Sequence, residues 1–327
     1  MKKIFKINKL ITFLAILLYA ASAPAQWQPD RNVALIVPSS AGGSLDNVGR
    51  TIQRMWDQLK LVPASSTIIN MAGGGHAIAY NFLNQRAGNP YFMSITSSTL
   101  HTSHINGRTK LSYRDFTPLT VMMTEYIAFA VRADSPLKTG KDLIEALRAD
   151  PAKYSLALSS AVGGTHHISF GLPLLSGKVD IKKLRMVAFN STGEAVTALL
   201  GGHVDVLSGG TVQIAPHVAS GRMRLLAVTS AQRLPGVLAS APTWPELGYK
   251  GVFENWRGII GTKGMQKQEV AYWDGVFGKI AVSPEFKEIA TKNQWEINYK
   301  NSAETRKFME TEYRELKEVM EFLGLAK

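Results

Sequence analysis

The chain has 327 residues, a formal net charge of +12 at pH 7 and no cysteine. A chain of this length exceeds one ordinary hydrophobic core, which predicts two domains. The lack of cysteine excludes disulfides, thiolate metal sites, a cysteine nucleophile and a lipid-modified cysteine. Lysines and arginines are scattered along the chain without a basic run, so we expect no nucleic-acid partner.

Residues 1–25 carry the three parts of a secretory signal peptide. Lysines between residues 2 and 9 precede an apolar stretch from Leu10 to Ala21, which Ala23-Pro-Ala25 follows. This stretch is shorter than the ~20 residues that cross a bilayer, which disfavours a membrane anchor. We expect cleavage after Ala25 and export of the mature chain to the periplasm, where its remaining positive charge would attract anionic solutes.

From Val33 onward, strand-like and helix-like segments alternate, which predicts an α/β fold with parallel sheets. We expect strands over 33–38, 66–70, 91–96, 116–123, 126–132, 154–158, 186–189, 204–207, 225–229, 252–260 and 295–299. Helices are expected up to about residue 60, over 74–86, around 143–148, over 165–175, around 196–200 and in three stretches near the C-terminus. Strands 116–123 and 126–132 follow each other so closely that the chain could pass there between two lobes. The last helix carries an apolar stripe from Met309 to Leu323, which we expect to dock on the first lobe.

The segment from Val33 to Asp46 places a glycine loop between a short apolar strand and an amphipathic helix. Free backbone amides and the helix dipole both favour an anion at a helix N-terminus, so we predict that this loop binds the ligand. The loop residues are Ser39, Ser40, Ala41, Gly42 and Gly43. Asp46 in the first helical turn has two open roles, contact with the ligand and capping of the amides, of which we favour capping.

Further loops rich in glycine, serine and threonine follow other predicted strands, at 72–75, 96–99, 159–167 and 208–211. In open α/β sheets, ligands bind beyond the carboxyl ends of the strands, so these loops would gather at one site. They offer amides and hydroxyls but few lysines or arginines, which suits reversible capture of a carboxylate by neutral dipoles. Thr165 and His167 are candidate contacts, although a buried histidine bonded to the backbone is the common alternative.

The sequence gives weaker support to three other functions, namely nucleotide binding, hydrolysis and metal binding. Nucleotide binding lacks the spacings G-x-x-x-x-G-K-[ST] and G-x-G-x-x-G. A periplasmic serine hydrolase acting on a small anionic substrate lacks a G-x-S-x-G elbow, although a serine hydroxyl within hydrogen-bond reach of His167 would favour it. His166 and His167 do not make a metal pair, because adjacent helical residues face different points. We therefore expect no metal, no cofactor and no catalytic residue.

Several motifs occur in a fixed order along the chain. They are Val37-Pro-Ser-Ser-Ala-Gly-Gly-Ser-Leu-Asp46 with Arg50, the loop Gly73–Gly75, Gly201-Gly-His-Val-Asp205, Ser220-Gly-Arg-Met-Arg-Leu-Leu-Ala-Val-Thr-Ser230 with Arg233, and Ala241-Pro-Thr-Trp-Pro-Glu-Leu-Gly248. In their order and spacing they resemble the substrate-binding proteins of tripartite tricarboxylate transporters, the Bug (TctC) family, over nearly all of the mature chain. The resemblance implies a type II periplasmic binding protein fold, with two α/β lobes around a ligand cleft and no catalysis.

We expect the first lobe over residues 26–122 and 253–327 and the second lobe over 123–252. Members of this family hold carboxylate-bearing solutes between the lobes, largely through main-chain amides and ordered waters, which implies a small carboxylate ligand. Besides the loop 39–43 and Asp46, the matching motifs imply contacts from Gly73, Gly74, Gly75, Ser97, Ser98, Thr99, Ser159, Thr165, His167, Phe189, Asn190 and Asp205. The implied partner is a two-component membrane permease or a sensor, and a receptor without a transport partner is a further possibility. We expect a monomer that closes on its ligand by hinge motion.

Two segments depart from the family pattern. Gly88-Asn-Pro-Tyr91 stands in place of a Pro-Asp-Gly-Tyr turn, and Ala188-Phe-Asn-Ser191 stands in place of a Pro-Tyr-Lys-Gly segment. The second change removes a hydroxyl and a glycine. Phe189 and Asn190 are therefore the expected differences in specificity.

Overall fold

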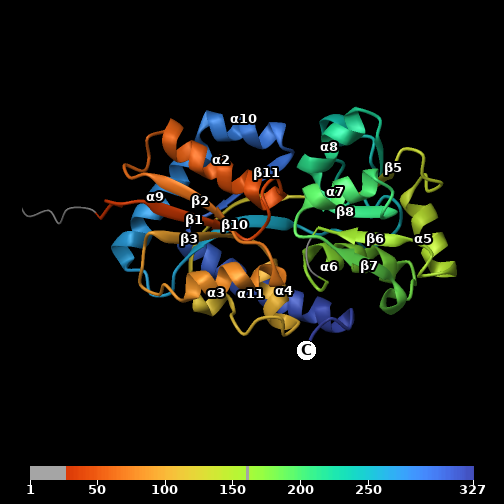
Figure 1. The fold of residues 1–327 in the computed structure, drawn as a ribbon, viewed down its shortest axis with the longest axis horizontal. Helices are drawn as coiled ribbons and strands as arrows, with labels where there is room; N and C mark the ends of the chain where they lie inside the picture. Colours follow the sequence, from red (N-terminus) through yellow and green to blue (C-terminus); the bar gives the residue numbers. More distant parts are fainter. Residues whose placement is uncertain (1–26, 160–161) are drawn as a thin grey trace, which may run out of the picture.

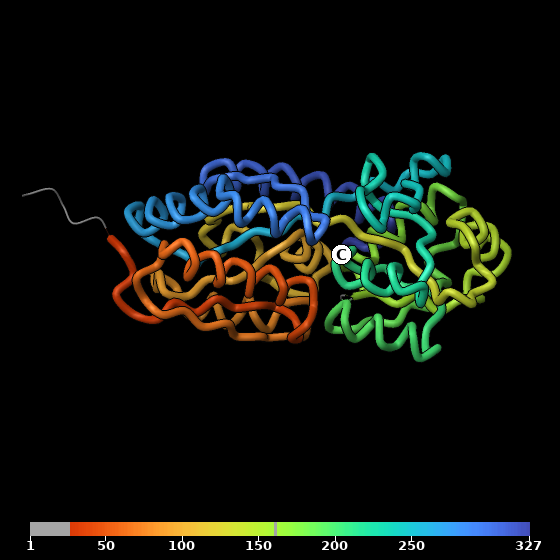
Figure 2. The backbone as a smooth tube through the Cα atoms, turned by 90° about the horizontal axis from the view of Figure 1, so that it is seen from above, coloured from red at the N-terminus to blue at the C-terminus, as the bar shows by residue number. Residues whose placement is uncertain are grey.

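The protein folds into two lobes, each built around one β-sheet with helices packed on it (Figure 1). The computed structural model describes residues 27–159 and 162–327. The predicted signal peptide, residues 1–25, lies outside the described residues. In the described part of the chain, no helix has both the length and the apolar sequence that crossing a bilayer needs. Seen from above, the two lobes lie side by side along the long axis of the molecule (Figure 2).

The first sheet has six strands in the order β11-β4-β10-β3-β1-β2. Its parallel part consists of β1 (Val33–Val37), β2 (Ser66–Asn70) and β3 (Phe92–Thr96), with Val33 opposite Ser66. All five residues of β1 are buried, as expected of a strand that is covered on both faces. The sequence predicted these three strands to within one residue at each end.

The other three strands make this sheet mixed, so the expected parallel pairing holds for β1, β2 and β3 and not for the rest of the sheet. β10 (Asn255–Gly261) lies between β3 and β4 (Thr117–Glu125) and is antiparallel to both. β11 (Trp295–Lys300) is antiparallel to β4 at the sheet edge. The chain leaves the first lobe along β4, passes through the second lobe and returns along β10. The two strands therefore run in opposite directions.

The second sheet has five strands in the order β7-β6-β8-β5-β9. β7 (Arg185–Ala188), β6 (Ser155–Leu158) and β8 (Val206–Gly210) are parallel. β5 (Ile127–Arg132) is antiparallel to β8 and to β9 (Met223–Val228). One residue separates β4 in the first sheet from β5 in the second, so the chain passes between the lobes where the close succession of these strands suggested.

Helices cover both sheets (Figure 1). Around the first sheet lie α2 (Ser44–Gln58), α3 (Ala77–Asn84), α4 (Thr99–Ile105), α9 (Lys267–Val282) and α10 (Pro284–Lys292). Around the second sheet lie α5 (Gly140–Ala149), α6 (Thr165–Ser176), α7 (Thr192–Leu200) and α8 (Thr211–Ala219). Short 3₁₀ turns are η1 (Gly74–His76), η2 (Tyr113–Asp115), η3 (Ile181–Lys183) and η4 (Gly236–Leu238). The sequence did not predict α4 or α8. In α4, threonine, serine and histidine have weak helix propensity, and burial of six of its seven residues supplies the stabilisation.

The last helix, α11 (Ser302–Phe322), packs on both lobes. Met309 is buried in an apolar cluster beside the first sheet, whereas Leu316 and Met320 belong to the same apolar cluster as Phe129 of the second sheet. The expectation that this helix docks on the first lobe is therefore correct for its N-terminal half and incomplete for the rest. A helix packed on both lobes restricts the directions in which they can move relative to each other.

Candidate functional site

A cavity with about 360 Å³ of empty space lies between the two sheets, and we call it the inner cavity. Its walls come from loops at the carboxyl ends of β1, β3, β6 and β7, the ends at which α/β sheets bind ligands. The described residues that line it are Ser39, Ser44, Leu45, His76, Ser97, Thr99, Ser159, Thr165, His166, Asn190, Ser191, Thr192 and Arg257. Six of the residues that the sequence singled out are among them, namely Ser39, Ser97, Thr99, Ser159, Thr165 and Asn190.

Three helices of nine or more residues begin at the inner cavity, and the short helix α4 begins there as well, at Thr99. Ser44, Thr165 and Thr192 are the first residues of α2, α6 and α7, and all three line the cavity. The N-caps of α2 and α6 are Gly43 and Gly164, which have no side chain to bond the amides of the first turn. The dipoles of three helices therefore place their positive ends around one small volume, and uncapped amides are present in two of them. Such an arrangement favours an anion.

Asp46 holds the loop in front of α2. Its carboxylate accepts hydrogen bonds from the amide of Gly42, from Nε of Arg50 and from Nδ2 of Asn70, each 2.9 Å long. Burial alone would raise the pKa of the Asp46 carboxyl, but these hydrogen bonds outweigh burial, and the pKa lies below its ordinary value. The carboxylate is thus engaged by its own loop and helix, as the capping role requires.

The other residues of this loop differ in exposure. Ala41 and Gly42 are exposed and Ser40 is half-buried, whereas Ser39 and Gly43 are buried. Gly43 faces Ser191 of the second lobe so closely that a Cβ atom at residue 43 would lie 2.9 Å from the Ser191 Cβ. The loop is therefore a close contact between the two lobes as well as one wall of the site.

A second cavity, with about 570 Å³ of empty space, adjoins the first, and we call it the outer cavity. The two cavities share His76, Ser159 and Asn190. The outer cavity is also lined by Pro38, Gly73, Gly74, Gly75, Arg108, Ala188 and Phe189, which include four further residues that the sequence singled out. A ligand whose end lies in the inner cavity could therefore extend past His76 towards Phe189.

The backbone where the two cavities meet has an unusual conformation. Gly73, Gly74, Gly75 and His76 have successive φ angles of 118°, 60°, 62° and 74°. This region is open to glycine but costs a residue with a Cβ atom about 1–2 kcal/mol. The hydroxyl of Ser103 donates to the carbonyl of Gly75 at 2.7 Å and helps to hold the turn. Strain at a residue that lines both cavities makes His76 a candidate functional residue, which the sequence did not single out although it directly follows three glycines.

Eight residues that the sequence singled out line neither cavity, namely Ser40, Ala41, Gly42, Gly43, Asp46, Ser98, His167 and Asp205. Ser98 donates to the carboxylate of Glu312 at 2.5 Å. Nδ1 of His167 accepts from the amide of Gly163 at 2.8 Å, the backbone alternative considered for this histidine. Asp205 accepts from the amide and hydroxyl of the first residue of β6, at 2.8 and 2.7 Å. Each of these contacts stabilises the local fold.

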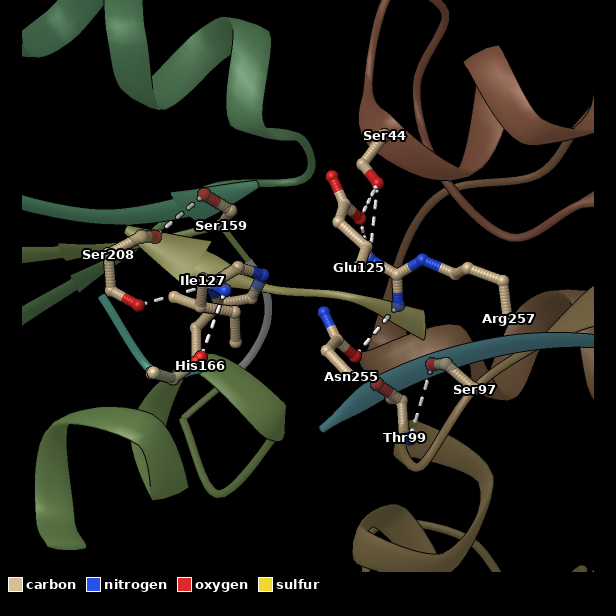
Figure 3. Close-up of polar contacts among 11 residues, drawn as sticks. Ser44, Ser97, Thr99, Glu125, Ile127, Ser159, His166, Ser208, Asn255 and Arg257 are labelled. Atoms are coloured by element: carbon tan, nitrogen blue, oxygen red, sulfur yellow. Dashed lines mark hydrogen bonds and ion pairs between the residues drawn. The ribbon is translucent and has the colours of Figure 1, made fainter. Parts of the chain in front are cut away.

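A buried ion pair on the cavity wall was not predicted. Arg257 of β10 lines the inner cavity, and its guanidinium lies 2.5 Å from the carboxylate of Glu125, the last residue of β4 (Figure 3). Arg257 also donates to Oδ1 of Asn255 at 2.8 Å and to the hydroxyl of Ser44 at 3.1 Å. The sequence did contain a signal for this pair, since each of the two largely apolar strands carries one charged residue. Buried charges are rare and usually occur in pairs.

His166 bears on the hydrolase alternative. Its Nδ1 lies 3.2 Å from the hydroxyl of Ser208, but Ser208 is fully buried and does not line either cavity. Burial, aided by the charge of Arg257, lowers the pKa of His166 to about 3, which makes it a poor general base at neutral pH. In the described part of the chain we find no serine that both faces the cavity and is hydrogen-bonded to a histidine. The geometry gives the hydrolase alternative no support.

Two α/β lobes that enclose an anion-favouring polar cavity define a two-lobed binding protein. Over residues 27–159 and 162–327, no group of three or more histidine, aspartate or glutamate side chains is placed to hold a metal ion. The site therefore offers helix amides, hydroxyls and two arginines, Arg257 in the inner cavity and Arg108 in the outer cavity, for ligand recognition.

The chain belongs to the family of tripartite tricarboxylate transporter receptors, whose family model matches residues 54–325. The Cupriavidus necator relative called UPF0065 protein in gbd 5'region is 26% identical over 314 residues, which cover 94% of this chain and 93% of the relative. The structure of the periplasmic binding protein BugD is 25% identical, with a TM-score of 0.82 over 91% of this chain and 99% of BugD. The structure of R. palustris Rpa4515 with adipate is 24% identical, with a TM-score of 0.83 over 91% of this chain and 99% of that one. These findings confirm the family resemblance and the periplasmic binding protein fold.

Proposed function

We propose that this chain is an exported, non-enzymatic receptor that captures a small carboxylate-bearing solute between its two lobes. The observation that carries the proposal is the convergence of three helix N-termini, at Ser44, Thr165 and Thr192, on one cavity. Uncapped amides and helix dipoles bind a carboxylate reversibly and need no bound metal or cofactor. Membership of the receptor family supports the same function.

In this proposal the ligand carboxylate lies in the inner cavity, beside Ser39 and Thr99 of the first lobe and Ser159 of the second. The remainder of the ligand extends into the outer cavity, where Phe189 and the loop Gly73–Gly75 surround it. Both cavities have walls from both lobes, so ligand contacts would favour the closed arrangement. The moving units would be the two lobes expected from the sequence, except that residues 123–125 belong to β4 and therefore to the first lobe.

Delivery of the solute would follow export and cleavage after Ala25. The mature chain would act as a monomer in the periplasm and present its ligand to the two-component membrane permease of a tripartite transporter, or to a sensor. The closed form differs in shape from the open form, so a membrane partner can distinguish the loaded receptor from the empty one. Pull-down of membrane components with loaded and empty receptor tests this step, and equal recovery of the permease by both forms would contradict it.

A thermal-shift screen of the mature chain, residues 26–327, tests carboxylate capture. The screen compares mono-, di- and tricarboxylates, acidic amino acids and aromatic acids with the matching uncharged amides. At a ligand concentration of 100 Kd, binding should stabilise the fold by about 2.7 kcal/mol, whereas the matching amide should leave the Tm unchanged. Absence of a shift with every carboxylate, or equal shifts with acid and amide, would contradict the proposal.

The same preparation tests the absence of catalysis. The receptor should not hydrolyse simple esters of the acids that stabilise it. Turnover of such an ester that is lost in Ser159→Ala and in His166→Asn would favour a hydrolase instead. Mass spectrometry of any acid that co-purifies with the chain would identify the ligand directly.

A further inference from the structure

The wall of the inner cavity contains a charge pair that is neutralised within the chain. The side chains of Arg257 and Glu125 are 4% and 0% exposed, and the guanidinium and carboxylate lie 2.5 Å apart. They lie on the paired strands β10 and β4, along which the chain enters and leaves the first lobe. In Figure 3 their charged groups meet at the side of this lobe that faces Ser159 and His166 of the other.

Most polar atoms of Arg257 and Glu125 form hydrogen bonds within the chain. Nη1 of Arg257 donates to Asn255 at 2.8 Å, and Nη2 donates to the Ser44 hydroxyl at 3.1 Å and to Glu125. The remaining guanidinium nitrogen, Nε, is buried and has no hydrogen-bond partner among the described residues. One oxygen of Glu125 also accepts from Ser44, and the other packs against Gly210 of the second lobe. A ligand in the cavity therefore meets an arginine whose charge is already paired and whose two terminal nitrogens already donate hydrogen bonds within the chain.

We propose that this pair makes the inner cavity accept one carboxylate and exclude a ligand that carries a second carboxylate on a neighbouring carbon. The inference rests on the proposed function and specifies how many carboxylates of the ligand the inner cavity accepts. Among the described residues that line the cavity, Arg257 alone carries a permanent charge, and the carboxylate of Glu125 pairs with it in place of a ligand carboxylate. Glu125 is thus the residue that determines this specificity.

The physical reason is the cost of an unpaired buried charge. Three helix N-termini supply partial charges for one anion. A second carboxylate in the same cavity would lose its hydration without gaining a counter-charge, because the arginine and glutamate together contribute no net charge. Specificity of this kind acts by rejecting the wrong ligand.

Calorimetric titration with matched ligand pairs tests the inference. The pairs are butanoate with succinate and benzoate with phthalate, which differ within each pair by one nearby carboxylate. In the wild-type chain we expect each monocarboxylate to bind at least tenfold more tightly than its dicarboxylate partner. In Glu125→Gln, which leaves the arginine charge uncompensated, the dicarboxylates should gain at least tenfold relative to the monocarboxylates.

Two further variants separate charge from folding. The double variant Glu125→Gln with Arg257→Gln again has no net charge, so the monocarboxylate preference should return. Glu296→Gln removes an exposed carboxylate that accepts from Tyr126, the residue next to Glu125, and should leave the preference unchanged. The wild-type comparison needs no variant and decides the inference even if Glu125→Gln fails to fold.

The outcomes distinguish this inference from the proposed function. Equal or tighter binding of the dicarboxylates by the wild-type chain overturns the inference and leaves carboxylate capture intact. An unchanged preference in a folded Glu125→Gln variant also overturns it. If no member of either pair binds and no other carboxylate stabilises the chain, the proposed function fails and the inference fails with it.

Discussion

The carboxylate of Asp46 and the amide of Gly42 are joined by a hydrogen bond of 2.9 Å that closes the loop in front of helix α2. The same carboxylate oxygen accepts from Arg50 one turn further along the helix, also at 2.9 Å. The loop that forms one wall of the cavity is therefore held by a side chain that points into its own loop. The position of the uncapped amides of α2 depends on this carboxylate.

Asp46→Ala should lower the free energy of unfolding by about 1–3 kcal/mol, because the amide of Gly42 and the side chain of Asn70 lose their buried acceptor. Carboxylate affinity should fall as well, since the loop is no longer held. Urea unfolding and calorimetric titration measure the two effects. The exposed Asp57→Ala on the same helix is the control and should stay within about 0.5 kcal/mol of the wild type. Equal losses in the two variants would show that Asp46 has no special role.

Gly43→Ala should prevent full closure of the lobes, because its Cβ atom would lie 2.9 Å from the Cβ of Ser191. We expect carboxylate binding to weaken by about tenfold or more, which corresponds to 1.4 kcal/mol, with little change in the stability of the empty chain. Gly43→Asp should weaken binding further by adding a like charge. The control is Gly275→Ala in α9, where no atom lies within 4 Å of the new Cβ and the affinity should not change. Retention of wild-type affinity by Gly43→Ala would remove this loop from the closed interface.

Asn106→Ala should accelerate release of the ligand. Nδ2 of Asn106 in the first lobe donates to the carbonyl of Gly163 in the second at 3.2 Å, a bond that exists while the lobes are closed. Loss of one such bond is worth about 0.5–1.5 kcal/mol, so we expect a Kd that is about 2–13 times higher. Stopped-flow fluorescence would assign the change to the dissociation rate. Asn81→Ala removes a comparable bond to Ala77 within one helix and should leave release unaffected.

Acidification should destabilise the chain through two histidines that line the inner cavity. Burial, aided by the charge of Arg257, lowers the pKa of His76 and of His166 to about 3, whereas their ordinary value is 6.5. Below pH 6.5 the unfolded chain binds protons that the folded chain does not, so the free energy of unfolding falls by up to about 1.4 kcal/mol per pH unit for each histidine. His166→Asn should reduce this slope between pH 6.5 and 5 in urea unfolding experiments. An identical slope in the variant and the wild type would contradict the neutral state of His166.

Local sequence patterns predicted the strands well and the short helices poorly. The apolar run from Val33 to Val37 and the strand from Ser66 to Asn70 are recognisable because strand formation there agrees with the local side-chain pattern. Helix α4, by contrast, consists largely of threonine, serine and histidine and is stabilised by burial. A propensity-based prediction cannot anticipate a helix whose stability comes from its packing.

The predicted site residues show the same division. Residues in the loops that follow β1 and β6 directly, such as Ser39 and Ser159, line the inner cavity because the carboxyl ends of the strands converge in this fold. His167 lies within α6 and Asp205 directly precedes β8, and the side chains of both are bonded within their own lobe. The position of a residue in the sequence indicates where its backbone lies in the fold. The direction in which its side chain points depends on its tertiary contacts.

The sequence by itself determined the α/β class, the glycine loop between β1 and α2, and the family resemblance, because each depends on residues that are near one another in the chain or on an ordered set of motifs. The tertiary structure alone decided that β10 runs antiparallel to β4, that α11 packs on both lobes, and that Arg257 meets Glu125 on the cavity wall. The arginine and the glutamate are 132 positions apart in the chain. Their pairing depends on the balance of burial, hydrogen bonding and charge across two strands, which no local pattern encodes.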